Sequence, residues 1–246
     1  DQFREGMRGE GFVEGDDYTL DVRAAGSSTE LLVPLARELV ALEPALILAV
    51  TTGSTQAARA VTSAVPIVMV AAHDPVEAGV VTSLSHPGGN VTGQSLMGGD
   101  LMPKQLELLA EIAPLKRIAY LSPHLASPAP GYVSVTDTFE RSMREKAGAR
   151  GIDVRALKWS EPAELVTLLT ALNAEGVDAI FMIESSTWFT PPAPRPLDRV
   201  VEVAIRRRLP SISGARGNGD AGLLMTYGSV VGPDNWRTVT RFVARI

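Results

Sequence analysis

Hydroxyl groups gather in the segment Thr51–Thr55, which has the sequence Thr-Thr-Gly-Ser-Thr and joins an apolar run to the start of a predicted helix. Free backbone N–H groups and the positive end of the helix dipole at such a turn bind a carboxylate or another anion. Thr52, Ser54 and Thr55 are therefore candidate ligand contacts. The alternative is that Ser54 or Thr55 only caps the helix, because serine and threonine are favoured in that role.

Two carboxylates follow other apolar runs. Asp74 lies between His73 and a proline, where it could bind a ligand ammonium or hydroxyl group while His73 donates a hydrogen bond. Asp74 could equally be the N-cap of a helix that begins at the proline. Glu184 could receive an amino group, or it could be a solvated loop residue.

Five further candidates lie at or just after the ends of predicted strands: Ser122, His124, Ser185, Gly214 and Arg216. Arg216 lies in a glycine-rich loop, where its guanidinium could clamp a carboxylate through two hydrogen bonds, although a solvated arginine fits the sequence as well. All the candidates follow the carboxyl ends of predicted parallel strands, which is where open parallel sheets bind ligands.

Sequence motifs for catalysis and metal binding are absent. The chain has no cysteine, no Gly-x-Ser-x-Gly, no His-Glu-x-x-His and no Walker motif, and Gly-Asn-Gly in the last loop does not qualify as a phosphate-binding loop. Its three histidines are too far apart in the sequence to indicate a metal cluster. The net charge is −5 and no basic stripe occurs, which argues against nucleic acid as a partner. We therefore expect no enzyme, no cofactor and no metal site.

Apolar periodicity alternates between helical and continuous-strand patterns, which is typical of an α/β fold with buried parallel strands. Strands are predicted over residues 18–23, 45–50, 66–70, 90–93, 117–122, 152–157, 178–183 and 210–213. Helices are predicted over residues 3–11, 29–42, 55–63, 101–112, 135–149, 163–175, 197–208 and 235–246, with one more directly after Asp74.

The two halves of the chain are weakly similar. Leu20–Arg23 matches Ile152–Arg155 at an offset of 132 (153 − 21), and Glu43–Ala45 matches Glu175–Val177 at the same offset (175 − 43). This repeat predicts two lobes of one topology, with residues 1–95 and 222–246 in lobe 1 and residues 96–221 in lobe 2. The second lobe opens with a strand that the first lacks. We therefore expect a missing N-terminal strand before Asp1, and a signal peptide before that strand.

Ordered motifs cover nearly the whole chain: 6–15 (Gly-Met-Arg-Gly-Glu-Gly-Phe-Val-Glu-Gly), 65–70, 74–76, 83–93, 105–109 and 221–228. The most specific is Pro-Gly-Gly-Asn-Val-Thr-Gly at 87–93. These motifs resemble the ABC-transporter substrate-binding protein family that includes tryptophan- and tyrosine-binding lipoproteins. The resemblance implies a type I periplasmic-binding fold, with two doubly wound parallel-sheet lobes and a hinge, and delivery of a captured solute to a membrane permease.

Two segments depart from the family pattern. Ala72-His73-Asp74-Pro75 stands where members often carry Val-Gly-Asp-Pro, and Ser122-Pro123-His124 stands where an Asn-Pro pair is common. The resemblance implies that both segments face the inter-lobe cleft. The ligand of a family member therefore cannot simply be transferred to this chain.

Taken with the resemblance, these patterns predict a monomeric solute-binding component of an ABC importer. It would be periplasmic or anchored to the outer side of the membrane, deliver to an ABC permease, and bind a small molecule in the cleft. A hydroxyl-rich anion turn opposite a carboxylate favours an amino acid or a related small carboxylate as that ligand. The alternatives are the ligand-sensing domain of a transcriptional regulator and that of a membrane sensor.

Overall fold

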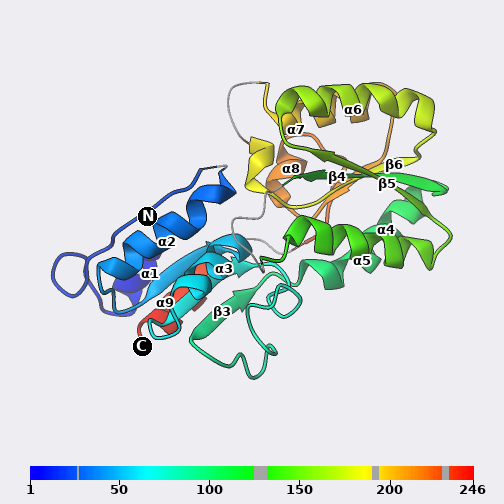
Figure 1. Ribbon diagram of the computed structural model, residues 1–246. Coiled ribbons are helices and arrows are strands. Elements are labelled where there is room, and N and C mark those ends of the chain that lie inside the picture. Colours follow the sequence, from blue (N-terminus) through cyan, green and yellow to red (C-terminus); the bar gives the residue numbers. More distant parts are fainter. Residues whose placement is uncertain (27, 125–131, 190–193, 229–232) are drawn as a thin grey trace. The chain divides into compact units, whose positions relative to one another are not determined.

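The computed structural model describes residues 1–26, 28–124, 132–189, 194–228 and 233–246 (Figure 1). The chain forms two compact units. Unit 1 comprises Asp1–Leu96, Ala126–Val135 and Val230–Ile246, and unit 2 comprises Met97–Leu125 and Thr136–Ser229. Each unit contains a parallel β-sheet with helices packed on it, so the predicted α/β class is confirmed. No helix in the described ranges is long and apolar enough to cross a membrane.

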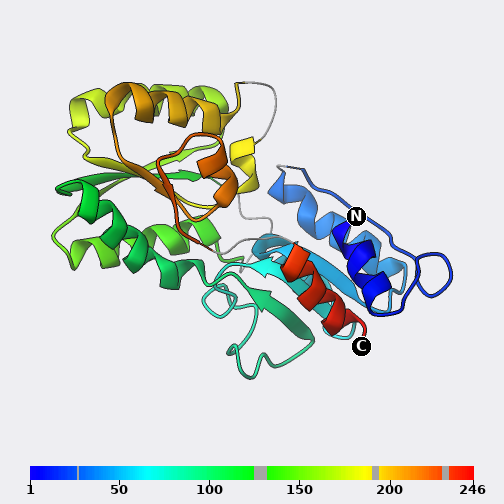
Figure 2. The same cartoon turned by 180° about the vertical axis from the view of Figure 1, so that it is seen from behind.

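Unit 1 has a three-stranded sheet in the order β1-β2-β3, formed by β1 (Ile47–Thr51), β2 (Ile67–Ala72) and β3 (Val91–Ser95). Apolar residues alternate along β2, so that Ile67 and Met69 face helix α3 while Val68 and Val70 face helix α9. Figure 2 shows α1 beside α9, whereas α2 packs on α3. These helices of unit 1 are α1 (Gln2–Gly9), α2 (Leu32–Ala41) with a preceding turn η1 (Thr29–Leu31), α3 (Thr52–Val61) and α9 (Pro233–Val243).

Unit 2 has a five-stranded parallel sheet in the order β5-β4-β6-β7-β8. Its strands are β4 (Arg117–Pro123), β5 (Asp153–Trp159), β6 (Ala179–Met182), β7 (Ser211–Ser213) and β8 (Met225–Thr226). Helices α6 and α7 cover one face of the sheet and α4 and α5 the other (Figure 1). The helical elements are α4 (Gly98–Ile112), α5 (Val135–Gly148), α6 (Pro162–Glu175), η2 (Ser186–Phe189), α7 (Pro196–Arg207) and α8 (Arg216–Asp220).

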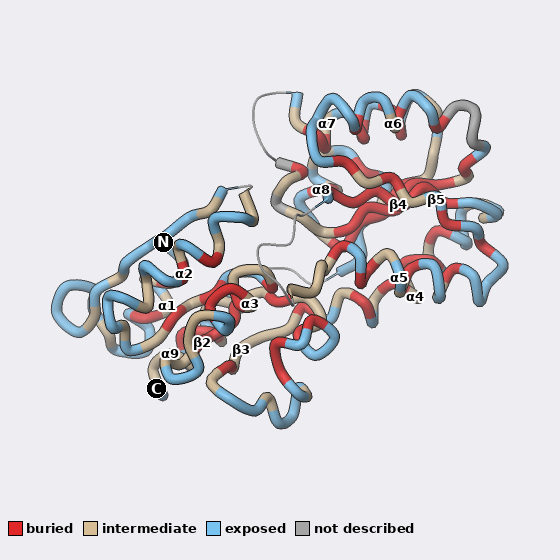
Figure 3. Tube along the Cα trace, in the orientation of Figure 1, coloured by how far each residue is buried: buried red, intermediate tan, exposed pale blue. Residues whose placement is uncertain are grey.

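Burial follows the strands of unit 2 closely (Figure 3). Every residue of β6 is buried, and β4 is buried apart from its first residue, Arg117. Each of these strands has a neighbour on both edges and helices on both faces, so its side chains meet other apolar groups in every direction. The strand ends of unit 2 therefore rest on a rigid, close-packed base.

Two predicted elements of unit 1 are wrong. Residues 18–23 are mostly exposed and form no strand in the described chain, where only an isolated bridge joins Glu14 to Tyr18. Their repeat counterpart, β5, pairs with β4, whereas among the described residues no strand lies beside 18–23. The segment after Asp74 is a series of turns instead of a helix. The Ala78 N–H donates to the Asp74 carbonyl, but Gly79 then adopts a left-handed φ of 66° and ends the helical hydrogen bonding after one turn.

The expected boundary at residue 222 also differs from the structure. Residues 222–228 lie in unit 2, since β8 pairs with β7 and the Tyr227 N–H donates to the Ser213 carbonyl. Leu223 is buried in the core beside α7, which fixes this segment to unit 2. The glycine-rich loop that was expected around Arg216 contains the short helix α8.

Candidate ligand-binding site

The hydroxyl-rich turn of unit 1 caps helix α3. Thr51 Oγ1 accepts a hydrogen bond from the Ser54 N–H at 3.2 Å, and Ser54 Oγ accepts one from the Thr51 N–H at 2.9 Å, which makes a capping box. The fully buried Thr55 donates its hydroxyl to the Thr51 carbonyl at 2.8 Å. The hydroxyls of Ser54 and Thr55 therefore hold the turn together, as the capping alternative anticipated, with Thr51 as the N-cap.

Thr52 links the start of α3 to the end of β2. Its hydroxyl oxygen accepts from the His73 N–H at 2.8 Å and lies 3.2 Å from the His73 carbonyl, to which it can donate. Burial lowers the pKa of His73 to about 4, so its imidazole is neutral at neutral pH. The side chains of Thr52, His73 and Asp74 thus lie at one edge of the unit 1 sheet, beyond the ends of β1 and β2.

Backbone N–H groups remain at this helix start. The capping box uses the N–H of Ser54, whereas the first N–H groups of a helix, here those of Thr52 and Gly53, have no acceptor within the helix. Helix dipoles favour negative charge at that position. The turn therefore offers backbone donors for an anion, while its side-chain hydroxyls are already engaged.

Tyr132 is a further candidate residue, which sequence reasoning missed. Although it lies between β4 and α5 in the sequence, it belongs to unit 1. A β-carbon on Gly53 would lie 2.8 Å from the Tyr132 hydroxyl oxygen, so the phenol rests over the first turn of α3. Burial raises the pKa of Tyr132, which keeps its hydroxyl protonated as a donor. The sequence signal was Gly53 itself, because glycine is a poor choice inside a helix unless something approaches closely.

The neighbouring backbone anchors this tyrosine. Gln56 on α3 donates its side-chain amide to the Val133 carbonyl at 3.3 Å and to the Ala78 carbonyl at 3.0 Å. One glutamine therefore ties the residue after Tyr132, the segment after β2 and helix α3 together.

Unit 2 brings a second group of candidates to the carboxyl ends of β4 and β6. Ser122 is fully buried, and its hydroxyl has no hydrogen-bond partner among the described residues. Burial raises the pKa of Glu184 to about 7. The Ser185 hydroxyl lies 2.8 Å from that of Thr187. His124 is exposed, and its backbone N–H donates to the Trp159 carbonyl at 2.7 Å.

Gly214 and Arg216 follow β7 and have different surroundings. Gly214 is buried, and a β-carbon there would overlap the Glu184 carboxylate. Arg216 differs from Gly214: its side chain is 75% exposed, and its guanidinium lies 3.9 Å from the Asp220 carboxylate. The structure therefore brings Glu184 and Gly214 into contact and leaves Arg216 at the surface.

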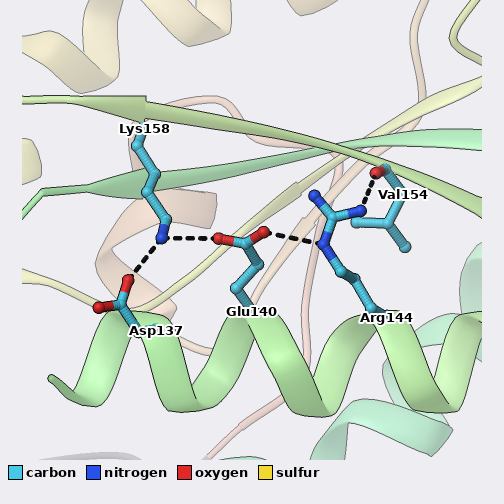
Figure 4. A network of polar contacts seen from close by, with 5 residues as sticks. All are labelled: Asp137, Glu140, Arg144, Val154 and Lys158. Atoms are coloured by element: carbon cyan, nitrogen blue, oxygen red, sulfur yellow. Dashed lines mark hydrogen bonds and ion pairs between the residues drawn. The ribbon is translucent and has the colours of Figure 1, made fainter. Parts of the chain in front are cut away.

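Lys158 stands beside Ser122 in the sheet register and would be the obvious cation for an anionic ligand. Figure 4 shows that its ammonium group instead pairs with Asp137 and with Glu140, the latter at 2.8 Å. Glu140 also pairs with Arg144, which donates to the Val154 carbonyl. This network attaches α5 to β5. Because two carboxylates pair with Lys158, its ammonium charge is already balanced and is not available to a ligand.

The candidates thus form two groups, one at the carboxyl edge of each sheet. Unit 1 contributes donors around Thr52, Gly53 and Tyr132, and unit 2 contributes the Glu184 carboxylate. Across the described ranges, no three His, Asp or Glu side chains come together in a way that could hold a metal ion.

Two parallel α/β units with polar groups at the carboxyl edges of their sheets are the architecture of the type I periplasmic-binding fold. A family model described as ABC transporter substrate binding protein matches residues 1–229. The chain belongs to this family, whose members are substrate-binding proteins and not enzymes.

Individual relatives agree with this assignment. A stretch of 114 residues is 38% identical to a tyrosine-binding protein of Clostridioides difficile (strain R20291), and it covers 46% of this chain and 32% of that relative. The match thus spans about a third of the relative's length.

Two solved structures share the fold. A conserved domain protein from Vibrio cholerae has a TM-score of 0.81 at 24% identity, over 99% of this chain and 77% of that one. An ABC domain in complex with L-Trp from Streptococcus pneumonia has a TM-score of 0.77 at 20% identity, with the same coverages of 99% and 77%. At such identities these structures establish the fold and leave the ligand of this chain open.

Proposed function

We propose that the protein is the solute-binding component of an ABC importer, acting outside the cytoplasm as a monomer that delivers its ligand to a membrane permease. The family match over residues 1–229 carries this proposal. An amino acid or a related small carboxylate is the proposed ligand. A tyrosine-binding protein among the relatives and an L-Trp complex among the fold neighbours support this class.

The carboxylate of the ligand would bind to unit 1. Its partners are the N–H groups of Thr52 and Gly53 at the start of α3, together with the Tyr132 hydroxyl that lies over Gly53. Three donors and the helix dipole suit a carboxylate, and no cationic side chain is needed there. The neutral imidazole of His73 adds an uncharged hydrogen-bonding group beside the turn.

The ammonium group of the ligand would bind to Glu184 of unit 2. An opposite charge within hydrogen-bonding distance favours the ionised carboxylate and lowers a pKa that burial has raised. Because each unit holds one end of a zwitterion, the ligand would draw the two units together around it. A ligand shifts such an open–closed equilibrium only by its differential affinity for the closed state, and contacts from both units provide that difference.

A thermal-shift screen of the purified full chain tests this function. The panel comprises L-tyrosine, L-tryptophan, L-leucine, glucose, ribose and succinate. At a hundred times its Kd, a ligand stabilises the native state by about 2.7 kcal/mol, which is readily measured. We expect at least one amino acid to stabilise the protein and the sugars to leave it unchanged. Stabilisation by a sugar alone would contradict the proposal.

A further inference from the structure

Tyr132 lies in a segment that chain connectivity does not hold on unit 1. Residues Ala126–Val135 belong to unit 1, but the chain before and after them belongs to unit 2. The position of Tyr132 on helix α3 therefore depends on non-covalent contacts. One is the close approach of its hydroxyl to Gly53, and another is the hydrogen bond that Gln56 Nε2 donates to the Val133 carbonyl at 3.3 Å.

The same glutamine holds a second segment beside the candidate site. Its Nε2 also donates to the Ala78 carbonyl at 3.0 Å. Thr52, one turn earlier on α3, bonds to the backbone of His73 at the other end of that segment. Residues four apart in a helix lie on the same face. One face of α3 therefore fixes segment 73–78 at both ends, and a single amide on that face also reaches the segment with Tyr132.

The oxygen of the Gln56 amide is buried and has no hydrogen-bond partner among the described residues. A buried acceptor without a partner lowers stability, and an apolar side chain of the same shape would avoid that loss. Stability alone therefore does not account for an amide at this position. Because the oxygen is enclosed by protein, the amide would act on a ligand through the two segments that its nitrogen holds.

We propose that Gln56 is a positioning residue for the ligand carboxylate, which holds the Tyr132 hydroxyl in place without touching the ligand. The inference rests on the proposed function and deepens it, because it names a residue that sets the affinity of that site. A hydroxyl donates well to an oxygen only at about 2.5–3.0 Å. A shift of Val133 moves the phenol on the preceding residue, so loss of the Gln56 hydrogen bond displaces the donor from the place where the carboxylate binds.

Calorimetry of the full chain with L-tyrosine, L-tryptophan, L-leucine and succinate tests this role through Gln56→Met. Methionine keeps the length and the helix propensity of glutamine and lacks its N–H groups. We expect the affinity for a compound that binds the parent to fall by about tenfold or more, as on loss of one hydrogen bond to a charged group. In the Tyr132→Phe background the same substitution should lower affinity by less than about twofold, because the donor that Gln56 positions is already absent.

Asn90→Leu is the matched control. Asn90 also lies in unit 1, and its Nδ2 donates to two backbone carbonyls, those of Thr62 at 3.2 Å and Val65 at 2.7 Å. It precedes β3, so this amide lies at the opposite edge of the parallel sheet from the candidate site. The substitution should lower the urea midpoint of unfolding and leave ligand affinity within about twofold of the parent.

The outcomes separate the two proposals. If none of the four compounds binds the parent protein, the proposed function fails. If one binds, the proposed function stands, and the positioning role is wrong in three cases: Gln56→Met keeps its affinity, Gln56→Met lowers it equally with and without Tyr132→Phe, or Asn90→Leu lowers it as much. Urea unfolding shows whether Gln56→Met is folded. If it is not, Gln56→Asn, which carries the amide on a shorter side chain, decides by the same criteria.

Discussion

Strands β1 and β6 hold equivalent places in the two units yet differ sharply in burial. At the repeat offset of 132 (182 − 50), Val50 corresponds to Met182, and Val50 is 48% exposed whereas Met182 is fully buried. In unit 2, β6 lies between β4 and β7, whereas β1 is the edge strand of a three-stranded sheet. The neighbours of a strand, more than its own residues, thus determine how far it is buried.

The two units also differ in the polar groups that they offer to a ligand. In unit 1 the side chains of Thr52, Ser54 and Thr55 are engaged in hydrogen bonds with backbone groups, and the donors left for a ligand are backbone N–H groups. In unit 2 the acceptor is the Glu184 carboxylate, which packs on Gly214. A ligand site in unit 1 therefore depends on backbone geometry, and one in unit 2 depends on side-chain packing.

The largest effect is expected for Gly214→Ala. The new methyl group overlaps the Glu184 carboxylate, so either Glu184 moves or the sheet does. Overpacking of this kind costs about 1–3 kcal/mol of unfolding free energy. Loss of the charged hydrogen bond to the ligand ammonium costs about 1.5–3 kcal/mol, or roughly ten- to a hundredfold in affinity. Urea unfolding and calorimetry measure the two effects.

Gly148→Ala is the matched control for this substitution. Gly148 ends α5 in the same unit, and no heavy atom lies within 4 Å of the position that a β-carbon would take there. Alanine is the better helix former, so this variant should keep its ligand affinity and be as stable as the parent or more so. Equal destabilisation by both substitutions would show that the contact between Gly214 and Glu184 is unimportant.

Gly53→Ala should have the next largest effect, on binding and not on stability. The methyl group would meet the Tyr132 hydroxyl and displace it from the first turn of α3. The gain in helix propensity, at most about 1 kcal/mol, offsets the lost contact. We expect affinity for the amino acid to fall by about tenfold, which corresponds to a loss of about 1.4 kcal/mol of binding free energy. The thermal midpoint should stay within a few degrees of the parent.

Tyr132→Phe removes the hydroxyl alone and distinguishes two explanations. If the hydroxyl donates to the ligand, Tyr132→Phe and Gly53→Ala should weaken binding to a similar extent, and combining them should add little. Full affinity in Tyr132→Phe would mean that the tyrosine only shields the turn.

Ser54→Ala should mainly affect stability. The substitution removes one half of the capping box on α3 and should cost about 1 kcal/mol of unfolding free energy. Since the Ser54 hydroxyl is bonded to Thr51, we expect affinity to change by less than about threefold, well below the value of a full hydrogen bond to a charged group. A tenfold loss of affinity without loss of stability would return Ser54 to the ligand site.

Patterns that depend on local sequence were predicted well, and those that depend on distant partners were not. The α/β alternation and the strands from β1 to β7 follow from apolar periodicity. Residues 18–23 have the pattern of a strand, but a strand forms only where another lies beside it. The segment after Asp74 is an exception with a local cause, because the left-handed backbone of Gly79 ends the turn before a helix forms.

In the candidate site, too, residues defined by local sequence could be predicted, whereas residues defined by distant contacts could not. Strand-end positions such as Thr52, His73 and Glu184 could be predicted, because they follow directly from where the strands end. Tyr132 could not, because its place in the site rests on a contact with Gly53, which is distant in the sequence. Arg216 has the right chemistry, but α8 turns it toward solvent.

Finally, we expect the stabilities of the two units to depend on pH in opposite directions. Burial lowers the pKa of His73 from 6.5 to about 4, so the unfolded chain binds more protons at this group and unit 1 gains stability as pH rises from about 4 to 6.5. Burial raises the pKa of Glu184 from 4.5 to about 7, so the folded chain binds more protons there and unit 2 loses stability as pH rises from about 4.5 to 7.

Trp236 packs on Phe3 in unit 1, whereas Trp159 and Trp188 pack together in unit 2, so the Trp236→Phe variant limits fluorescence to unit 2. Without ligand, the urea midpoint of that variant should be lower at pH 7 than at pH 5, and adding Glu184→Gln should abolish this decrease. An unchanged slope after that substitution would mean that Glu184 does not titrate in this range.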